Sequence, residues 1–220
     1  MAADEVGGAV PLDAARLEAG LQALAARDPD IARALTRVGL PEPRVQPPGF
    51  STLLRIIVGQ QVSTKAAAAI WGRLEQGLGE VTPAALLAMS DEAVRACGLS
   101  RPKLAYAKGL AEAVVDGRLD IAGLERADDE AALAAITALK GFGRWSAEIY
   151  LLFALGRADT WPAGDLGVRL GLMRLKGLAE RPTDAQMAEH GERWRPHRGC
   201  AAIFLWKVYG STTLESTAES

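Results

Sequence analysis

Several residue types are scarce in this sequence, and each shortage excludes a class of protein. Only two of the 220 residues are cysteines, Cys97 and Cys200, which is too few for a disulfide framework or a four-thiolate iron–sulfur site. We therefore expect two buried free thiols in a reducing cytoplasm. The longest apolar runs, such as residues 150–155, are far too short to span a bilayer, and the acidic N-terminus lacks a secretory pattern. Secretion and membrane insertion are both unexpected.

Histidine and net charge are also low. The two histidines, His190 and His197, belong to no HxxxH or His/Cys grouping, which argues against transition-metal catalysis. A net charge of −2 and a pI of about 5.8 normally count against a nucleic-acid partner. The distribution of charge matters more than the sum, because basic residues crowd the last third of the chain and permit a local basic face. They are Arg169, Arg174, Lys176, Arg181, Arg193, Arg195 and Arg198.

Alternating strand patterns are nearly absent, and almost every segment has helical spacing of its apolar residues. Two apolar stripes consist of Leu12, Leu17, Leu21 and Leu24, and of Leu53, Ile56, Ile57, Val62 and Ile70. Thr82 and Ser100 are typical of helix starts, and residues 183–186 of a capping box. Six glycines predict helix ends: Gly39, Gly98, Gly117, Gly156, Gly177 and Gly210. The sequence predicts an all-α protein of about ten short helices.

The proline-rich segment 41–48 is the clearest boundary in the chain, since each proline removes a donor and restricts the residue before it. We expect two helical subdomains with a cleft between them and Asp165 at the seam. Residues 51–165 would form a central barrel-like subdomain, and residues 1–50 would pack with residues 166–212 as the second. Residues 213–220 are small and polar and are expected to fray.

Two motifs carry the functional hypothesis. Residues 139–147 read LKGFGRWSA, in which two glycines permit a tight turn and let the amide N–H groups of the next helix face an anion. Residues 161–167 read WPAGDLG and place Asp165 at the start of a helix, where its carboxylate can stand beside a gripped DNA strand. Either motif alone also fits an ordinary structural role, because glycine commonly ends helices and aspartate commonly caps them.

Together these motifs resemble the helix-hairpin-helix superfamily of base-excision DNA glycosylases. Residues 58–67, VGQQVSTKAA, look like the helix that the alkylpurine branch, the 3-methyladenine DNA glycosylase II family, inserts towards the lesion. Residues 194–198, WRPHR, look like the C-terminal helix of that branch. The match covers residues 50–209 and lacks the N-terminal antiparallel β domain of some bacterial members, so the chain is similar to the shorter, yeast-like form.

The resemblance implies a role for each site residue. Asp165 would be the catalytic carboxylate, stabilising the oxocarbenium character of the sugar or orienting water, and a cationic alkylated purine needs no second acid to leave. Trp145 stands where bifunctional relatives carry a lysine nucleophile, which implies no AP-lyase activity. Trp145, Trp206 and Ile149 would line the base pocket, with Ile149 replacing a tyrosine of some relatives. Gln61 would fill the gap left by the everted nucleotide.

Binding to the DNA backbone is assigned by the same resemblance to the hairpin. The implied DNA-binding residues are Gly141, Gly143, Arg144 and Ser146. Main-chain carbonyls of the hairpin often hold a monovalent cation in this family, and a structural Na⁺ or K⁺ would here be bound by Thr137, Leu139 and Phe142. No cofactor is required for the chemistry.

The sequence therefore predicts a monofunctional DNA glycosylase that flips alkylated purines, such as 3-methyladenine and 7-methylguanine, out of duplex DNA and hydrolyses the N-glycosidic bond. We expect a cytoplasmic, bacterial-type, nucleoid-associated monomer whose partner is double-stranded DNA with alkylated bases. The alternatives are a non-enzymatic helix-hairpin-helix DNA-binding module, a glycosylase for oxidised or mismatched bases, and a helical protein–protein scaffold. The sequence leaves open the preferred lesion, including deaminated purines and methylated pyrimidines.

Overall fold

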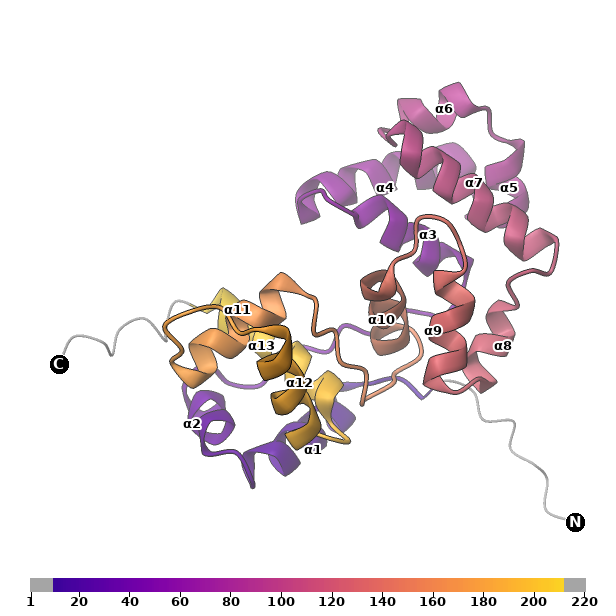
Figure 1. Ribbon diagram of the computed structural model, residues 1–220. Helices are drawn as coiled ribbons and strands as arrows, with labels where there is room; N and C mark the ends of the chain where they lie inside the picture. The colour runs from indigo at the N-terminus through magenta and orange to yellow at the C-terminus, as the bar shows by residue number, and fades with distance from the viewer. Residues whose placement is uncertain (1–9, 212–220) are drawn as a thin grey trace, which may run out of the picture. The chain divides into compact units, whose positions relative to one another are not determined.

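The structure is a computed structural model that describes residues 10–211 (Figure 1). Within that range the chain forms thirteen helices and no strand, which confirms the all-α prediction. Two compact units are present: unit 1 contains Gln46–Leu155 with Val10, and unit 2 contains Pro11–Val45 and residues 156–211. Asp165 therefore lies within unit 2, ten residues past the division of the chain rather than at it. The expected frayed tail, 213–220, lies outside the described residues.

Unit 1 is built around α3, which packs against α4, α7 and α10. The helices of this unit are α3 (Phe50–Gly59), α4 (Thr64–Leu78), α5 (Pro83–Ala88), α6 (Asp91–Ala96), α7 (Arg101–Val115), α8 (Ile121–Arg126), α9 (Asp129–Thr137) and α10 (Arg144–Phe153). Leu53 and Ile57 of α3 and Leu110 of α7 are buried in one apolar core with Tyr150 of α10. The Tyr150 hydroxyl accepts a hydrogen bond from the Gly49 N–H at 2.9 Å. Burial raises the pKa of Tyr150 to about 12, so the phenol stays neutral.

Unit 2 combines helices from the two ends of the described chain. They are α1 (Ala14–Ala25), α2 (Pro29–Val38), α11 (Leu166–Lys176), α12 (Asp184–Arg193) and α13 (Arg198–Gly210). The closest packing joins α11 to α13, because a Cβ atom on Gly171 would lie 2.2 Å from the Leu205 carbonyl oxygen. Leu17, Leu21 and Leu24 of α1 are buried as their spacing predicts.

The helix punctuation is largely confirmed. Thr82 and Ser100 cap α5 and α7 with their side chains, and Thr183 and Gln186 form the capping box of α12. Five of the six predicted stop glycines have positive φ: Gly39, Gly98, Gly117, Gly156 and Gly177. Gly210 is the exception, since it is the last residue of α13 and Ser211 follows as the cap. Residues 41–48 contain no helix, as their prolines require.

The prediction of one continuous helix over residues 58–67 is wrong. Helix α3 ends at Gly59 and α4 begins at Thr64 after the N-cap Ser63, and residues 60–63 form a turn between them. Gln61 has a φ of 54°, which no α-helix accommodates, and this breaks the periodicity read through the segment. Val62 is consequently 39% exposed instead of belonging to a buried stripe.

Both thiols are buried and free, as the sequence predicts. Burial raises the pKa of Cys200 to about 11, so this thiol is protonated and unreactive at neutral pH. No helix of the described residues is long and apolar enough to cross a membrane.

Candidate active site and DNA interface

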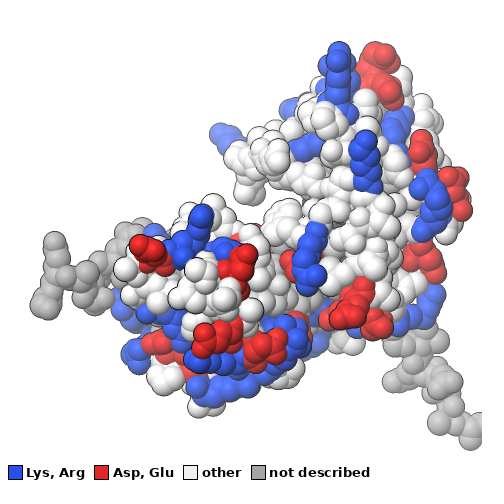
Figure 2. Space-filling view, in the orientation of Figure 1, with Lys and Arg blue, Asp and Glu red and all other residues white. Residues whose placement is uncertain are grey.

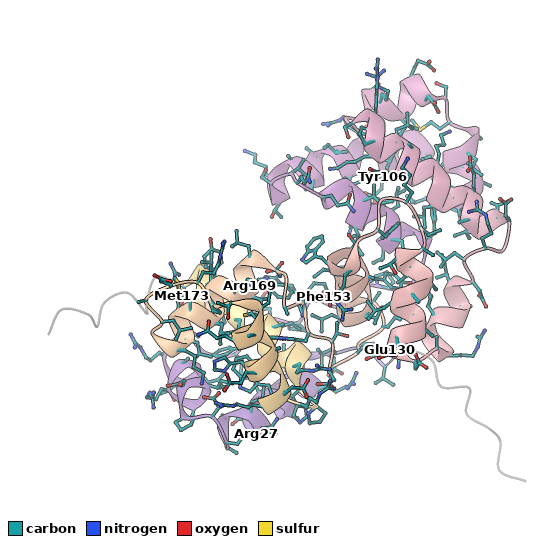
Figure 3. The ribbon with its side chains drawn as sticks, in the orientation of Figure 1. Arg27, Tyr106, Glu130, Phe153, Arg169 and Met173 are labelled. Carbon is teal, nitrogen blue, oxygen red and sulfur yellow. The ribbon has the colours of Figure 1, made fainter. Side chains whose placement is uncertain are left out.

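The two glycines of the hairpin between α9 and α10, Gly141 and Gly143, have different structural roles. Gly141 has a φ of 96°, and a Cβ atom there would lie 2.3 Å from Cγ of Tyr106 on α7 (Figure 3). The fold itself therefore requires glycine at this position. Gly143 has an ordinary extended backbone, with φ of −87°, and no atom lies within 4 Å of a Cβ built on it. The second glycine leaves open space in front of the helix.

Helix α10 starts at that open space without a side-chain cap, because Gly143 has no side chain to accept from the first turn. The first N–H groups of a helix have no partner within it and carry partial positive charge, which favours an anion. Arg144 adds a cation at this helix start. Its Nε donates to Glu148 Oε1 at 2.8 Å, while most of the arginine side chain remains exposed.

Glu148 is a buried carboxyl group whose partner is an exposed cation. It is 4% exposed, and desolvation raises its pKa although Arg144 opposes the change. The contact holds the Arg144 side chain against α10, one turn further along the same helix. The spacing of four residues was visible in the sequence, but the burial of Glu148 was not.

Ser146 does not present its hydroxyl at the surface. It is 3% exposed, and Gln60 Nε2 donates to its Oγ at 3.2 Å. A DNA contact from this residue would have to come from its main-chain N–H in the first turn of α10. The same Gln60 nitrogen donates to the Gly141 carbonyl at 2.8 Å, so Gln60 is bound to the backbone of the hairpin.

The expected pocket residues come from both units. Trp145 and Ile149 are one helical turn apart on α10, where Trp145 is 39% exposed and Ile149 is half-buried. Such an exposed indole is unusual for a core residue and fits a stacking role. Trp206 belongs to α13 in unit 2. Gln61, the expected wedge, is exposed in the turn between α3 and α4.

Asp165 is the N-cap residue of α11 and also contacts one of the expected pocket residues. Its Oδ1 accepts from the Val168 N–H at 2.9 Å and from Trp206 Nε1 at 2.8 Å. Asp165 is half-buried, so the carboxylate is held by its neighbours without being enclosed in the core. A plain helix cap needs only the first of these bonds, and the second orients the carboxylate further.

Gly167 makes the contact between Asp165 and Trp206 possible. A Cβ atom on Gly167 would lie 2.8 Å from Trp206 Cδ1 and 3.2 Å from Asp165 Oδ1. A side chain there would push the indole away from the carboxylate. The glycine of the DLG motif was read from the sequence only as part of a family pattern, and its packing role emerges from the structure.

The segment that leads to Asp165 is anchored from both sides. Arg169 on α11 (Figure 3) donates from Nε to the Ala163 carbonyl at 2.8 Å, and it forms an ion pair with Asp184. The indole N–H of Trp161 donates to the Met187 carbonyl at 3.0 Å. These bonds tie the loop before Asp165 to α11 and α12, so the position of the carboxylate is supported on both sides.

Trp206 has neighbours that limit its use as a stacking surface. Its N–H group is engaged by Asp165, and the guanidinium of Arg44 lies 5.2 Å from the ring centroid. Arg44 is remote in sequence, and no motif marked it. The arrangement suits a residue that supports the carboxylate at least as well as one that stacks on a base.

Most of the basic residues in the last third have acidic partners. Five of them form ion pairs within unit 2, and Figure 2 shows positive and negative groups interspersed there. The pairs are Arg169–Asp184, Lys176–Asp28, Arg193–Glu189, Arg195–Asp159 and Arg198–Asp159. Each of these acidic partners offsets the charge of its cation, so crowding of basic residues in the sequence does not by itself predict a basic face.

The carbonyls expected to hold a cation lie where α9 ends. Thr137 is the last residue of α9, and the Leu139 carbonyl accepts from the Phe142 N–H at 3.1 Å. The carbonyl end of a helix carries partial negative charge, and each carbonyl oxygen has two lone pairs, so this donor set suits a monovalent cation. Among residues 10–211, no group of three or more His, Cys, Asp and Glu is placed to bind a metal ion.

The comparisons with known proteins agree with this geometry. A family profile described as "HhH-GPD superfamily base excision DNA repair protein" matches residues 54–196. DNA-3-methyladenine glycosylase 1 of Schizosaccharomyces pombe is 37% identical over 163 residues, which are 72% of this chain and 72% of that protein.

Two solved structures have the same fold. The 3-methyladenine DNA glycosylase of Schizosaccharomyces pombe in complex with abasic DNA superposes with a TM-score of 0.79 at 34% identity, covering 86% of this chain and 95% of that one. A DNA-3-methyladenine glycosidase from Bacillus halodurans gives a TM-score of 0.77 at 36% identity, covering 87% and 89% of the two chains.

Proposed function

Because this chain belongs to the HhH-GPD superfamily of base excision DNA repair proteins, we propose that it is a DNA glycosylase that releases alkylated purines from duplex DNA. The observation that carries the proposal is the half-buried carboxylate of Asp165, oriented by Val168 and Trp206 at the start of α11. The similar proteins of known structure include a 3-methyladenine DNA glycosylase in complex with abasic DNA.

DNA binding would begin at the hairpin of unit 1. The uncapped start of α10 offers peptide N–H groups to a phosphate, and Gly143 leaves room for the strand to approach them. Arg144 would add a charge-assisted contact to the backbone. Gln61 would enter the duplex at the position of the everted nucleotide. This mode of binding needs few basic residues, which reconciles it with the acidic total charge.

The reaction would then depend on Asp165. As the base departs, positive charge develops on the deoxyribose ring, and a fixed carboxylate stabilises that charge or orients the attacking water. Two hydrogen bonds to Oδ1 hold the carboxylate in place before the reaction, so little reorganisation is needed during it. An alkylated purine carries a positive charge and leaves as a neutral base, so one carboxylate suffices.

The remaining features restrict the reaction and its setting. Trp145 has no amine with which to attack the sugar, so the enzyme would hydrolyse the glycosidic bond without AP-lyase activity. The exposed indole of Trp145 would stack on the electron-poor ring, with Ile149 beside it. The carbonyls of Thr137, Leu139 and Phe142 would hold Na⁺ or K⁺, which offsets the charge of a nearby phosphate when bound.

The protein would act as a monomer in the cytoplasm, on chromosomal DNA.

The test is base release from duplexes that each contain one defined lesion, 3-methyladenine or 7-methylguanine. Asp165→Asn keeps an oxygen that can cap α11 and accept from Trp206, but it removes the negative charge. We expect base release to fall by about 1000-fold or more, since electrostatic stabilisation of this kind is worth several kcal/mol. Binding to a duplex with an abasic analogue should stay within about threefold of the parent.

Two outcomes would contradict the proposal in different ways. Undiminished base release by Asp165→Asn would show that this carboxylate is not catalytic. Tight binding of abasic DNA without release of any alkylated base by the parent protein would favour a non-enzymatic DNA-binding module. Alkaline cleavage of the product, compared with cleavage without alkali, tests the absence of lyase activity in the same samples.

A further inference from the structure

The turn at residues 60–63 holds a residue in an unfavourable conformation. Gln61 is the one residue other than glycine with positive φ among residues 10–211, at 54°. This conformation is disfavoured for a residue with a Cβ atom and persists only where the surroundings enforce it. Gln61 and Val62 are both exposed, so their own side chains do not hold the turn in place. The restraint must come from their neighbours.

Gln60 provides such a restraint, and its partners are in the hairpin. Its Nε2 donates to the Gly141 carbonyl at 2.8 Å and to Ser146 Oγ at 3.2 Å. Gly141 lies in the loop before α10, and Ser146 lies in the first turn of that helix. One amide group therefore joins the turn to the hairpin loop and to the first turn of α10 within unit 1.

Lys103 on α7 holds the other side of the same turn. Its Nζ donates to the Val58 carbonyl at 2.8 Å, close to the end of α3. A cation is favourable at this end of a helix, where carbonyls lack partners. The end of α3 is thus fixed to α7, while Gln60 fixes the following residue to the hairpin.

We propose that Gln60 is a positioning residue that holds Gln61 and Val62 at a fixed place relative to the phosphate-binding start of α10. The inference rests on the proposed function, because it requires Gln61 to enter the duplex while α10 holds the strand. A side chain that must enter one base step as a phosphate is bound elsewhere needs a defined separation between the two elements. The side-chain amide of Gln60 fixes this separation directly, since both of its hydrogen bonds are made to hairpin residues.

The experiment separates positioning from simple stabilisation. Gln60→Met keeps the length of the side chain and removes both hydrogen bonds. Gln186→Met is the matched control, because it removes the hydrogen bonds of the Gln186 side chain in the capping box of α12 in unit 2, far from the turn in sequence. Both variants should unfold at lower temperature than the parent protein. The readouts are affinity for undamaged duplex, affinity for a duplex with an abasic analogue, and fluorescence of 2-aminopurine placed beside the analogue, which reports unstacking.

We expect Gln60→Met to bind undamaged duplex within about twofold of the parent, because the phosphate contacts remain. Its preference for the abasic-analogue duplex should fall about tenfold, and the fluorescence increase should fall with it. Gln186→Met should keep the preference and the fluorescence increase of the parent. Ser146→Ala removes only the longer of the two bonds and should show a smaller loss, which decides the matter if Gln60→Met does not fold.

The inference is overturned if Gln60→Met, or Ser146→Ala where only that variant folds, keeps the preference and the fluorescence increase while Gln61→Ala loses both. Gln60 would then be a structural residue alone. Equal losses for Gln60→Met and Gln186→Met would also overturn it, because general destabilisation would explain them. If the parent protein itself neither prefers the analogue nor unstacks the neighbouring base, the proposed function fails instead.

Discussion

The starts of α10 and α11 satisfy the same physical requirement in opposite ways. Each helix begins with N–H groups that have no partner in the helix. At α11 the side chain of Asp165 accepts from the Val168 N–H, so the helix provides its own anion. At α10 the cap residue is Gly143, which has no side chain to accept from the first turn. One helix start is filled by a carboxylate, and the other is left open.

The proposed function assigns DNA recognition to the start of α10 and the chemistry to the start of α11. An open helix start with a cap residue that lacks Cβ suits an external anion such as a DNA phosphate. A filled helix start fixes a carboxylate, which can then face a developing positive charge. Placing a carboxylate cap at the open helix start should therefore remove its ability to bind a phosphate.

The most decisive change is Gly143→Asp, which gives α10 a cap like that of α11. The extended backbone and the open space at Gly143 accommodate the side chain, and helix capping should stabilise the fold by roughly a few tenths of a kcal/mol. DNA affinity should nevertheless fall on the order of 100-fold, because the new carboxylate occupies the amides and repels phosphate. Fluorescence anisotropy with a labelled duplex, together with thermal unfolding, measures both effects.

Gly143→Asn is the matched control for charge. It caps the same N–H groups without adding a negative charge, so its loss of affinity should lie between those of the parent and Gly143→Asp. A Gly143→Asp protein that binds duplex as tightly as the parent would show that the start of α10 does not hold a phosphate.

A second change weakens the support of the filled helix start. Trp206→Phe keeps an aromatic ring beside Gly167 but removes the N–H group that donates to Asp165. Losing one hydrogen bond to a charged group costs about 1.5 kcal/mol or more, so base release under single-turnover conditions should slow about tenfold. Affinity for abasic-analogue DNA should change little, since the carboxylate remains.

Trp194→Phe is an internal control for this prediction. Trp194 Nε1 donates to Asp28 Oδ2 at 2.9 Å, which is the same kind of bond at another place in unit 2. This variant should lose stability and keep the base-release rate of the folded protein. Equal slowing by both variants would mean that Trp206 acts through stability alone.

The sequence predicts the helices and the hairpin well, because capping residues, glycine stops and apolar periodicity are local signals. Thr183 and Gln186 form their capping box, and Gly141 has the positive φ that a tight turn needs. The break at Gln61 was missed because a non-glycine residue in the left-handed region leaves no mark in the sequence pattern. Its conformation depends on the hydrogen bond between Gln60 and the hairpin residue Gly141, and these two residues lie far apart in sequence.

The site is less readable than the fold for a similar reason. Asp165, Trp145 and Trp206 were chosen by resemblance to a family, and their roles stay predictions. The bond between Asp165 and Trp206 depends on how α11 packs against α13 at Gly167, which no spacing shows. The charge pattern is hard to interpret for the same reason, since most basic residues of the last third form ion pairs, and four of those five pairs join residues that are distant in sequence.

The smallest expected effect concerns the cation at the open helix start. Glu148 is buried against Arg144, and desolvation raises its pKa above the ordinary value of 4.5. Above the raised folded-state pKa, the buried charge reduces the stability of the folded protein. As pH falls through that pKa towards 4.5, the folded state takes up the proton first and stability is gained. Glu148→Gln has no such proton, so its stability relative to the parent should be greatest near neutral pH and should decline on acidification.

Denaturant unfolding of both proteins across a pH series measures that difference directly. Glu189→Gln is the control, because Glu189 forms an exposed ion pair of the same spacing with Arg193, and such pairs contribute about 0–1 kcal/mol. Its difference from the parent should vary little with pH. If the Glu148→Gln difference is equally flat, burial of Glu148 does not set its protonation. A rise on acidification would mean that Arg144 outweighs desolvation and that the open start of α10 holds its cation more firmly than the geometry indicates.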